Sequence, residues 1–379
     1  MKVALVCDWL TNVGGAEKVL LELHHLYPEA PIYTSQYDEK GIDWFKGVDI
    51  RTGWLQKFPA GMRRVLGPFR QWYFSHLDLS EYDLIISVTG AEAKAVKSGK
   101  RLHDKGKKNV KNPNGIHISY CHVPTQYYWQ MRDEYIKNPG FGLLNPLVRF
   151  FFKVLLVPLR RADLKAAKNP DYYITISDYA KKQIKKHYKR EAKIIHPPVE
   201  ISDFKNPAKK AEIGDKFITT SRQVNWKKID LAIKACMMTQ RKLVIIGNGP
   251  EHKKLERLAK DSGLVEFLPI MDKKKLAEYL AGAKGYLFPS LEPFGIAPVE
   301  ALAAGCPVIA FGVGGANDYI IDGENGVLFK PQSAKGLAEA IMRFEKMKFN
   351  RNKIPKTADK FDIERFDKEI KDFVDDKTK

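Results

Sequence analysis

Two glutamates beside a predicted helix N-terminus are the residues of this sequence best suited to chemistry. Glu292 and Glu300 are eight positions apart: Glu292 follows an apolar strand expected over 286–288, and Glu300 lies in a helix expected from about Pro298 to Ala304. The N–H groups of residues 294–297 would lack helical acceptors and lie at the positive end of the helix dipole, which suits an anion. Two acids flanking such a site would fit a ligand with phosphates and hydroxyls. Alternatively, Glu292 is a solvated loop acid and Glu300 a first-turn acid favoured by the dipole.

Two further features of the first half of the chain could contact a ligand. A strand at Met1–Cys7, the pair Gly14-Gly15 and a helix expected over Ala16–Leu26 form a loop through which backbone can approach a phosphate. The full dinucleotide fingerprint is absent, and many such turns bind nothing. His122 follows a strand expected over Ile116–Cys121, and ligands bind at the carboxyl ends of strands in open α/β sheets. The alternative is a hydrogen-bonded structural histidine.

The elements that would position these residues alternate between strand and helix through both halves of the chain. This alternation predicts two parallel, doubly wound sheets, and 379 residues suit two domains. A proline-stiffened stretch ending at Pro207 is expected to link them, and residues 363–374 are expected to form an amphipathic helix. The remaining strands are expected at 32–34, 83–87, 172–176, 217–220, 242–246, 265–268 and 307–311, and the main remaining helices at 63–76, 177–189, 229–236, 251–262 and 276–281.

The composition indicates a globular protein with an acidic partner. The formal net charge is +19, and the excess lies mainly in the middle of the chain, which favours a phospholipid surface, a phosphorylated substrate or nucleic acid. A lysine-rich proteome is the alternative explanation. We expect no signal peptide, because the first apolar run is short and ends at Asp8, and no membrane-spanning run. The cysteines lack metal-site spacing and are expected to be reduced, packed thiols of a cytoplasmic protein. They are Cys7, Cys121, Cys236 and Cys306.

Three segments leave their roles open. Residues 141–167 are strongly apolar with interspersed basic residues, which predicts either a helix lying at a membrane surface or two core-packed helices broken near Pro158. Residues 99–115 are polar, basic and rich in turn formers, so we expect an exposed loop without an assigned role. The helix after Ser177 would present a cationic face made of Lys181, Lys182, Lys185, Lys186, Lys189 and Arg190.

Six sequence blocks in order resemble family 4 retaining glycosyltransferases of the GT-B fold, especially a bacterial mannosyltransferase branch of surface-polysaccharide and O-antigen assembly. The blocks are ALVCDWLTNVGGAEKVL, ISYCHVPTQYYW, IHPPVEISDF, SRQVNWKKIDLAI, IIGNGPEHKKLE and LFPSLEPFGIAPVEALAAGCPVIAFGVGG. The resemblance implies two Rossmann-like domains facing a central cleft. Residues 1–196 would form the acceptor-side domain, 197–207 the linker, 208–355 the donor-binding domain, and 356–379 a segment packing back on the first domain.

The resemblance also implies roles for individual residues. Arg222 and Lys227 would bind the donor diphosphate, because fixed cations stabilise a leaving nucleoside diphosphate without a metal. Glu292 and His122 would bond hydroxyls of the transferred sugar, and the oxygen of the leaving phosphate would take the acceptor's proton. Glu300 would accept from the ribose hydroxyls. The other implied donor contacts are Gly14 and Gly15 at the diphosphate, Phe294, Gly295 and Ile296 at the sugar and phosphate, and Gly247, Gly249, Ile270 and Met271 at the base.

The function implied is transfer of a hexose, foremost mannose from GDP-mannose, to a lipid-linked glycan, with no metal and no cofactor. The enzyme would be cytoplasmic, with possible peripheral attachment to the inner face of an anionic plasma membrane. Alternatives within the fold are a transferase using UDP-linked glucose, galactose or N-acetylglucosamine, and a sugar-nucleotide 2-epimerase. A nucleic-acid-binding protein is a remote alternative, because the basic residues lack the interleaved aromatic residues of a stacking platform. Trp226 departs from the small or polar residue common in the family.

Overall fold

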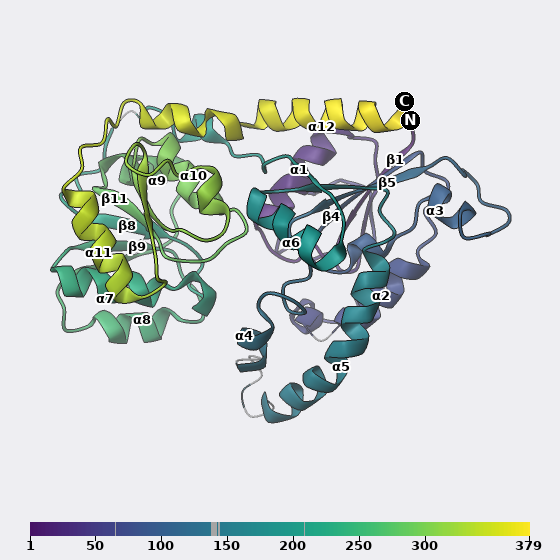
Figure 1. The fold of residues 1–379 in the computed structure, drawn as a ribbon, viewed down its shortest axis with the longest axis horizontal. Helices are drawn as coiled ribbons and strands as arrows, with labels where there is room; N and C mark the ends of the chain where they lie inside the picture. The colour runs from purple at the N-terminus through teal and green to yellow at the C-terminus, as the bar shows by residue number, and fades with distance from the viewer. Residues whose placement is uncertain (65, 138–141, 143–144, 208) are drawn as a thin grey trace. The chain divides into compact units, whose positions relative to one another are not determined.

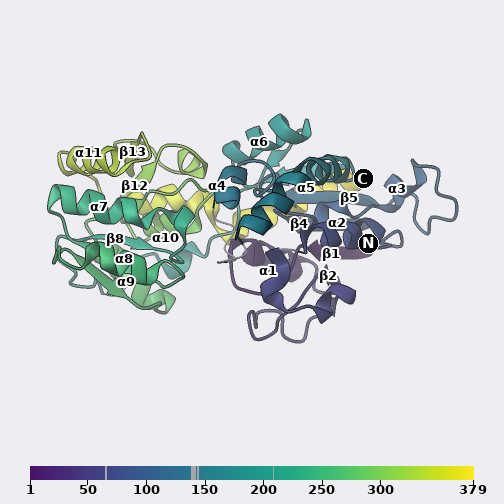
Figure 2. The same ribbon diagram turned by 90° about the horizontal axis from the view of Figure 1, so that it is seen from below.

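The computed structural model describes residues 1–64, 66–137, 142, 145–207 and 209–379 (Figures 1 and 2). The chain divides into two compact units, each with its own parallel sheet. The first unit contains Met1–Pro197 and Asp367–Lys379, and the second contains Pro198–Phe366. The two doubly wound sheets expected from the sequence are therefore confirmed.

The first unit is built on a seven-stranded sheet with the order β3-β2-β1-β4-β5-β6-β7. Every residue of its central strands β1, β4 and β5 is buried, as expected for a parallel sheet covered by helices on both faces. The strands are β1 (Val3–Cys7), β2 (Ile32–Thr34), β3 (Ile50–Arg51), β4 (Leu84–Thr89), β5 (Ile116–Cys121), β6 (Tyr172–Thr175) and β7 (Lys193–Ile194).

Helices of the first unit flank this sheet (Figure 1). They are α1 (Gly15–Leu26), α2 (Gly67–His76), α3 (Gly99–His103), α4 (Arg132–Lys137), α5 (Asn145–Ala166), α6 (Asp178–Tyr188) and the last part of α12 (Ile363–Thr378). Short 3-10 turns cover Trp54–Lys57, Ala60–Arg64 and Ala93–Ala95. The loop expected over 99–115 therefore begins with a helix, because the Ser98 hydroxyl caps its first turn by accepting from the Arg101 N–H.

The second unit is built on a six-stranded sheet with the order β10-β9-β8-β11-β12-β13. Its strands are β8 (Phe217–Thr220), β9 (Leu243–Ile246), β10 (Val265–Leu268), β11 (Gly285–Phe288), β12 (Val308–Phe311) and β13 (Gly326–Phe329). Its helices are α7 (Ile229–Thr239), α8 (His252–Ala259), α9 (Lys273–Gly282), α10 (Ile296–Ala303) and α11 (Ala334–Glu345). Helices α7 and α11 pack on one sheet face and enclose the main apolar core with Phe217, Leu243 and Leu287. Strand β13 and helix α11 have no counterpart among the predicted elements.

The unit boundaries differ from the predicted domain boundaries. Residues 198–207, expected to be a linker, lie in the second unit, where Val199, Ile201 and Phe204 are buried and the Val199 N–H donates to the Phe361 carbonyl over 2.9 Å. At the other end, residues 356–366 also belong to the second unit, because the 3-10 segment Ile354–Phe361 packs on α10. Only residues 367–379 join the first unit.

The predicted segment 141–167 contains one continuous helix, α5, with Pro158 inside it; residues 141, 143 and 144 lie outside the described residues. The interpretation as two core-packed helices is therefore wrong. A helix can bend past a proline when tertiary contacts hold both parts. Here Leu156, Asp163 and Ala166 are buried, whereas most of the larger apolar side chains of α5 are exposed. All four cysteines are buried and unpaired.

Candidate functional site

The carboxyl edge of the second sheet collects almost all of the predicted donor-site residues. Strands β10, β9, β8 and β11 are neighbours in that order and run in parallel, so the loops after them lie side by side. Ligands of open α/β sheets bind at this edge. From β10 to β11, these loops carry in turn Ile270 and Met271, then Gly247 and Gly249, then Arg222 and Lys227, and finally Glu292 with Phe294, Gly295 and Ile296.

The structure brings two predicted catalytic residues into direct contact. Lys227 ends a 3-10 turn after β8, and its Nζ lies 2.5 Å from Oε1 of Glu292, which follows β11. The Ser290 hydroxyl donates to the same oxygen over 2.9 Å. The Lys227 and Glu292 side chains are 24% and 19% exposed, so a ligand can reach both. The cation expected at the diphosphate and the acid expected at the sugar hydroxyls thus adjoin each other.

Close backbone contacts explain why both predicted positions after β9 are glycine. Gly247 has φ of +124°, and a Cβ there would lie 2.3 Å from the Ser221 carbonyl oxygen. A Cβ on Gly249 would lie 2.4 Å from the Gln223 carbonyl oxygen. The Gln223 side chain also donates to the Gly247 carbonyl over 2.8 Å. The loop carrying Arg222 therefore packs directly on the loop after β9, and a side chain at either glycine would separate them.

The turn before α10 depends on the backbone conformation of Gly295 and on its contact with the glycine pair Gly314-Gly315. Gly295, with φ of +93°, precedes the helix, which begins at Ile296, two residues earlier than predicted. The N–H of Gly315, beyond β12, donates to the Glu292 carbonyl over 2.8 Å, and a Cβ on Gly314 would lie 2.4 Å from that oxygen. The Tyr319 hydroxyl donates to the Phe294 carbonyl over 2.9 Å. Sequence reasoning assigned Gly314 and Gly315 no role, although a glycine pair after a buried strand signals close backbone approach.

The remaining donor-site residues differ in exposure. Arg222 is exposed, Ile270 is 77% exposed, and Glu300 is half-buried in α10. Glu292 and Glu300 both lie close enough to the buried Tyr286 hydroxyl to raise its pKa, although burial is the larger cause. The Phe294 ring is buried against Tyr319 and Phe361, so only its backbone is available to a ligand.

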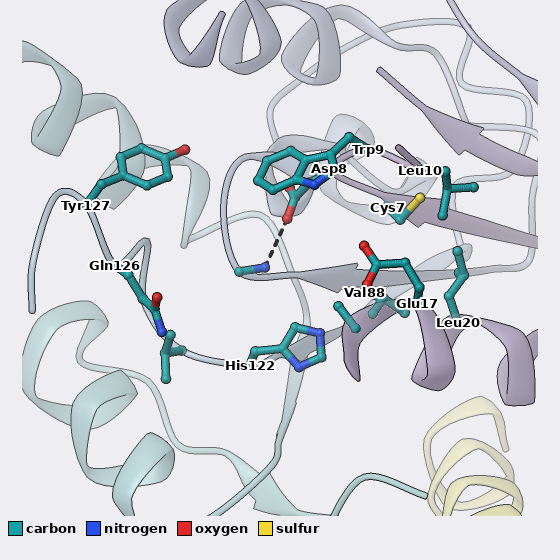
Figure 3. Close-up of a pocket in the computed structure, with 13 residues that line it drawn as sticks. Cys7, Asp8, Trp9, Leu10, Glu17, Leu20, Val88, His122, Gln126 and Tyr127 are labelled. Atoms are coloured by element: carbon teal, nitrogen blue, oxygen red, sulfur yellow. Dashed lines mark hydrogen bonds between the residues drawn. The ribbon is translucent and has the colours of Figure 1, made fainter. Parts of the chain in front are cut away.

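The first unit has a cavity of about 280 Å³ at the carboxyl ends of β1, β4 and β5 (Figure 3). His122 lines it, and burial lowers the pKa of its imidazole to about 4, so the ring is neutral at pH 7. Among the described residues, the buried His122 Nε2 atom has no hydrogen-bond partner. Gly14 is the N-cap of α1 and Gly15 its first residue, next to the lining residues Ala16 and Glu17.

Sequence reasoning missed the acids of this cavity. Asp8 follows β1, and its carboxylate accepts from the Thr89 hydroxyl at 3.0 Å and from the N–H groups of Gly90 and Ala93 at 2.9 and 2.6 Å. Glu17 is also buried, 8% exposed, and lines the cavity. The sequence did contain a signal for them, because Asp8 directly follows a buried strand and Glu17 lies in the first turn of the next helix.

A buried network behind the cavity holds the loop after β5. The Tyr127 hydroxyl donates to Glu92, whose other oxygen accepts from Arg70 Nε over 2.9 Å. Asp163 of α5 accepts from Thr125, Trp129 and Tyr188 at 2.8, 2.7 and 2.9 Å and pairs with Lys94 at 2.7 Å. The loop that carries His122 is therefore anchored to both α2 and α5.

Comparison with known proteins shows which family the second unit resembles. Residues 200–361 match the family model described as Glycosyl transferases group 1. The second unit is therefore similar to group 1 glycosyltransferase domains. Its sheet edge, with Lys227, Glu292 and the close-packed glycines, falls within the matched residues.

Curated relatives match this chain over part of their length. An uncharacterized glycosyltransferase of Methanocaldococcus jannaschii is 30% identical over 199 residues, covering 51% of this chain and 52% of that protein. A GDP-mannose-dependent phosphatidylinositol monomannoside mannosyltransferase of Mycolicibacterium smegmatis is 26% identical over 214 residues, covering 49% of this chain and 56% of that protein. The chain thus spans about half the length of these relatives.

Solved structures show the fold of the entire chain. Anabaena HepE in complex with UDP has a TM-score of 0.71 at 20% identity and covers 99% of this chain and 100% of its own. The lipopolysaccharide outer core galactosyltransferase WaaB has a TM-score of 0.69 at 17% identity, with 100% of both chains covered. The chain has the GT-B fold, which confirms the expected fold class.

Proposed function

We propose that this protein transfers a hexose from a nucleotide sugar to a glycan acceptor. The observation that carries the proposal is the contact between Lys227 and Glu292 at the carboxyl edge of a group 1 glycosyltransferase domain. A cation and an acid within 2.5 Å of each other, both accessible, match a ligand whose phosphate and hydroxyl groups are adjacent. A nucleotide sugar is such a ligand.

The roles proposed for individual residues are those that the family resemblance implies, and the order of loops along the edge supports them. Arg222 and Lys227 would neutralise the charge that accumulates on the leaving diphosphate, and Glu292 would accept from hydroxyls of the transferred sugar. Ile270 and Met271 after β10, with Gly247 and Gly249 after β9, would lie against the base, while Glu300 would accept from the ribose. We assign no metal or cofactor to the site, because the two cations already supply the charge the leaving group needs.

We propose GDP-mannose as the first donor to test. The sequence resemblance to the polysaccharide mannosyltransferases and the match to the GDP-mannose-dependent relative support it. A UDP-sugar is the second candidate, because another relative is the UDP-N-acetylglucosamine--peptide N-acetylglucosaminyltransferase GtfA subunit of Streptococcus gordonii, 29% identical over 187 residues. The acceptor proposed is a lipid-linked glycan, on the same resemblance.

A panel of labelled nucleotide sugars tests the proposal. We expect one donor to raise the melting temperature of the protein and to be transferred or slowly hydrolysed, because a ligand of the folded state stabilises it. Arg222→Ala and Glu292→Ala should each lower kcat by about 10²- to 10³-fold, the loss of one oriented contact worth ~2.7–4 kcal/mol. If no donor binds and both variants match the parent protein, the proposal fails. Conversion of the donor without any acceptor would favour the 2-epimerase alternative.

We further propose that α5 attaches the protein to an anionic membrane. Leu147, Phe150, Phe151, Val154 and Leu155 recur at helical spacing along one face of α5, and each is at least 42% exposed. Exposed Lys153 lies among them. No helix within the described residues is long and apolar enough to cross a membrane. A helix with an exposed apolar face and basic residues fits the lipid interface, where a lipid-linked acceptor would be found.

The cationic face expected on α6 contributes less than its sequence suggested. Lys182 pairs with Asp178 at 2.6 Å, and Lys185 pairs with Glu191. Arg190 donates to the carbonyls of Pro170 and Asp171. These contacts satisfy half of the predicted cations within the protein, so α5 is the better candidate for membrane contact.

Cosedimentation with vesicles containing phosphatidylserine tests this attachment. Phe150→Ser combined with Phe151→Ser should weaken binding at least about 10-fold, because the two largest apolar side chains of the face are replaced by polar ones. Met342→Ser, at a 54% exposed position on α11 of the second unit, is the matched control and should bind like the parent. Unchanged binding of the double variant would contradict attachment through α5.

A further inference from the structure

We propose that His252 is a positioning residue of the second unit: it orients the side-chain amide of Gln223, and Gln223 in turn holds the turn that carries Arg222. This role rests on the proposed function and deepens it, because Arg222 is the cation assigned there to the leaving diphosphate. The sequence patterns assign a role to neither Gln223 nor His252. The hydrogen bonds of Gln223 and the chemistry of the imidazole ring carry the assignment.

Gln223 joins the turn after β8 to the turn after β9. Its backbone N–H donates to the Asn248 carbonyl over 2.9 Å, and its carbonyl accepts from the Glu251 N–H over 3.1 Å. Its side-chain nitrogen lies 2.8 Å from the Gly247 carbonyl oxygen, and its side-chain oxygen lies 2.7 Å from Nδ1 of His252. Gln223 is 0% exposed, so a side-chain group that loses its partner here gains no water in exchange.

The Gly247 carbonyl determines the orientation of the Gln223 amide, and this orientation determines where His252 carries a proton. A backbone carbonyl only accepts, so the amide nitrogen must face Gly247 and the amide oxygen must face His252. The amide oxygen also only accepts, so Nδ1 of His252 must donate. A proton on Nδ1 is present in the imidazolium ion and in one of the two neutral tautomers, so the ring can make this contact in either charge state.

Two neighbouring elements hold the imidazole ring in place. His252 is the first residue of α8, and its backbone N–H donates to the Gly249 carbonyl over 3.0 Å. Its ring meets the Phe267 ring of β10 edge-on, with the centroids 5.4 Å apart. Its Nε2 atom lies 3.3 Å from Oε1 of Glu256, one turn further along α8. The ring nitrogen that remains for Gln223 is therefore Nδ1.

The backbone on both sides of Arg222 is tied to the turn after β9. The Ser221 N–H donates to the Ile246 carbonyl over 3.1 Å, and Gln223 follows with the contacts described above. Arg222 itself is exposed, so the position of its guanidinium group depends on the backbone that carries it. A hydrogen-bond donor on the His252 side chain is then a requirement for full affinity towards a diphosphate.

Replacing His252 by asparagine and by aspartate tests this requirement. The two new side chains have nearly the same shape, but asparagine can donate from the position of Nδ1, whereas aspartate presents only acceptors to the Gln223 oxygen. In calorimetric titrations of the full chain with GDP and with UDP, His252→Asn should stay within about 3-fold of the parent for the diphosphate that binds. His252→Asp should bind it at least about 10-fold more weakly.

Two controls separate this role from simpler effects. A role limited to the stability of α8 predicts no loss in His252→Asp, because the helix dipole favours an acid in the first turn. Lys253→Asp places a carboxylate on the adjacent, exposed residue of α8 and should leave diphosphate affinity within about 2-fold of the parent, which tests simple charge repulsion. In the Arg222→Ala background, His252→Asp should change the affinity by less than about 2-fold, because the cation that it positions is absent.

NMR of the histidine side chains tests the bridge without any ligand. At about pH 8.5, where histidine is ordinarily neutral, long-range nitrogen–proton spectra should show the His252 proton on Nδ1, with His252→Asn identifying its signals. A proton on Nε2, or equal diphosphate affinities of His252→Asn and His252→Asp in a parent that binds diphosphate, would overturn the inference and leave the proposed function standing. A parent that binds no diphosphate would refute the proposed function, and with it the role of His252 in diphosphate binding.

Discussion

Replacing Glu292 by glutamine should have opposite effects on two measurable steps. In the unliganded protein Lys227 is held by Glu292 at 2.5 Å, so a diphosphate must compete with the carboxylate for this cation. Glutamine has nearly the same size but no charge, and it releases Lys227. We therefore expect Glu292→Gln to bind the nucleoside diphosphate more tightly than the parent, and to transfer sugar more slowly.

The magnitudes follow from the exposure of the pair. Solvent-exposed ion pairs contribute about 0.2–1 kcal/mol, and hydrogen bonds to charged groups contribute about 1.5–3 kcal/mol. The Lys227 and Glu292 side chains are 24% and 19% exposed, so their ion pair lies between these two classes and remains screened by water. We therefore take about 1 kcal/mol as the free energy that the pair contributes. That energy corresponds to about 5-fold tighter diphosphate binding. Loss of an oriented contact to the sugar should lower kcat by about 10²- to 10³-fold.

Calorimetric titration and steady-state kinetics measure the two effects separately. The diphosphate used should be that of the donor identified by the panel. Glu339→Gln removes the same charge from an exposed position on α11 and should match the parent in both assays. A dissociation constant for the diphosphate that stays equal or rises in Glu292→Gln would refute the idea that Glu292 restrains Lys227.

Three other predictions follow from separate contacts. Gly249→Ala should weaken donor binding at least about 10-fold, since its Cβ would push the Arg222 loop outward; titration with the donor measures this. Asp163→Asn should cost about 3–5 kcal/mol in urea unfolding by leaving buried Lys94 unpaired, whereas Asp230→Asn, in an exposed helix pair with Lys234, should cost under about 0.5 kcal/mol. Burial lowers the His117 pKa to about 3, so the unfolded state binds more protons below pH 6.5. The stability of the first unit should then fall as pH drops from 6.5 towards 3, by up to about 1.4 kcal/mol per pH unit for this residue, and His117→Gln should flatten the fall measured by tryptophan fluorescence.

The sequence alone determined the two sheets and the elements that carry the site. Apolar runs such as those of β1 and β5 identified fully buried strands, because a parallel sheet covered on both faces leaves no polar side. Turn residues located the loops after these strands, and thus which residues reach the carboxyl edge. Ligand contact at that edge is a consequence of topology, so the loops holding Glu292 and His122 could be selected without coordinates, whereas Arg222 and Lys227 were selected by the family resemblance.

Tertiary structure decided which of these residues meet. Lys227 and Glu292 are 65 positions apart, and only the pairing of β8 with β11 brings them into contact. The roles of Gly314 and Gly315 depend on backbone approach from another loop, which no local pattern encodes. The place of the Glu17 carboxylate beside Gly14 and in the cavity lining was likewise set by packing. Side-chain direction and long-range pairing are set by packing, whereas strand and helix patterns are set locally.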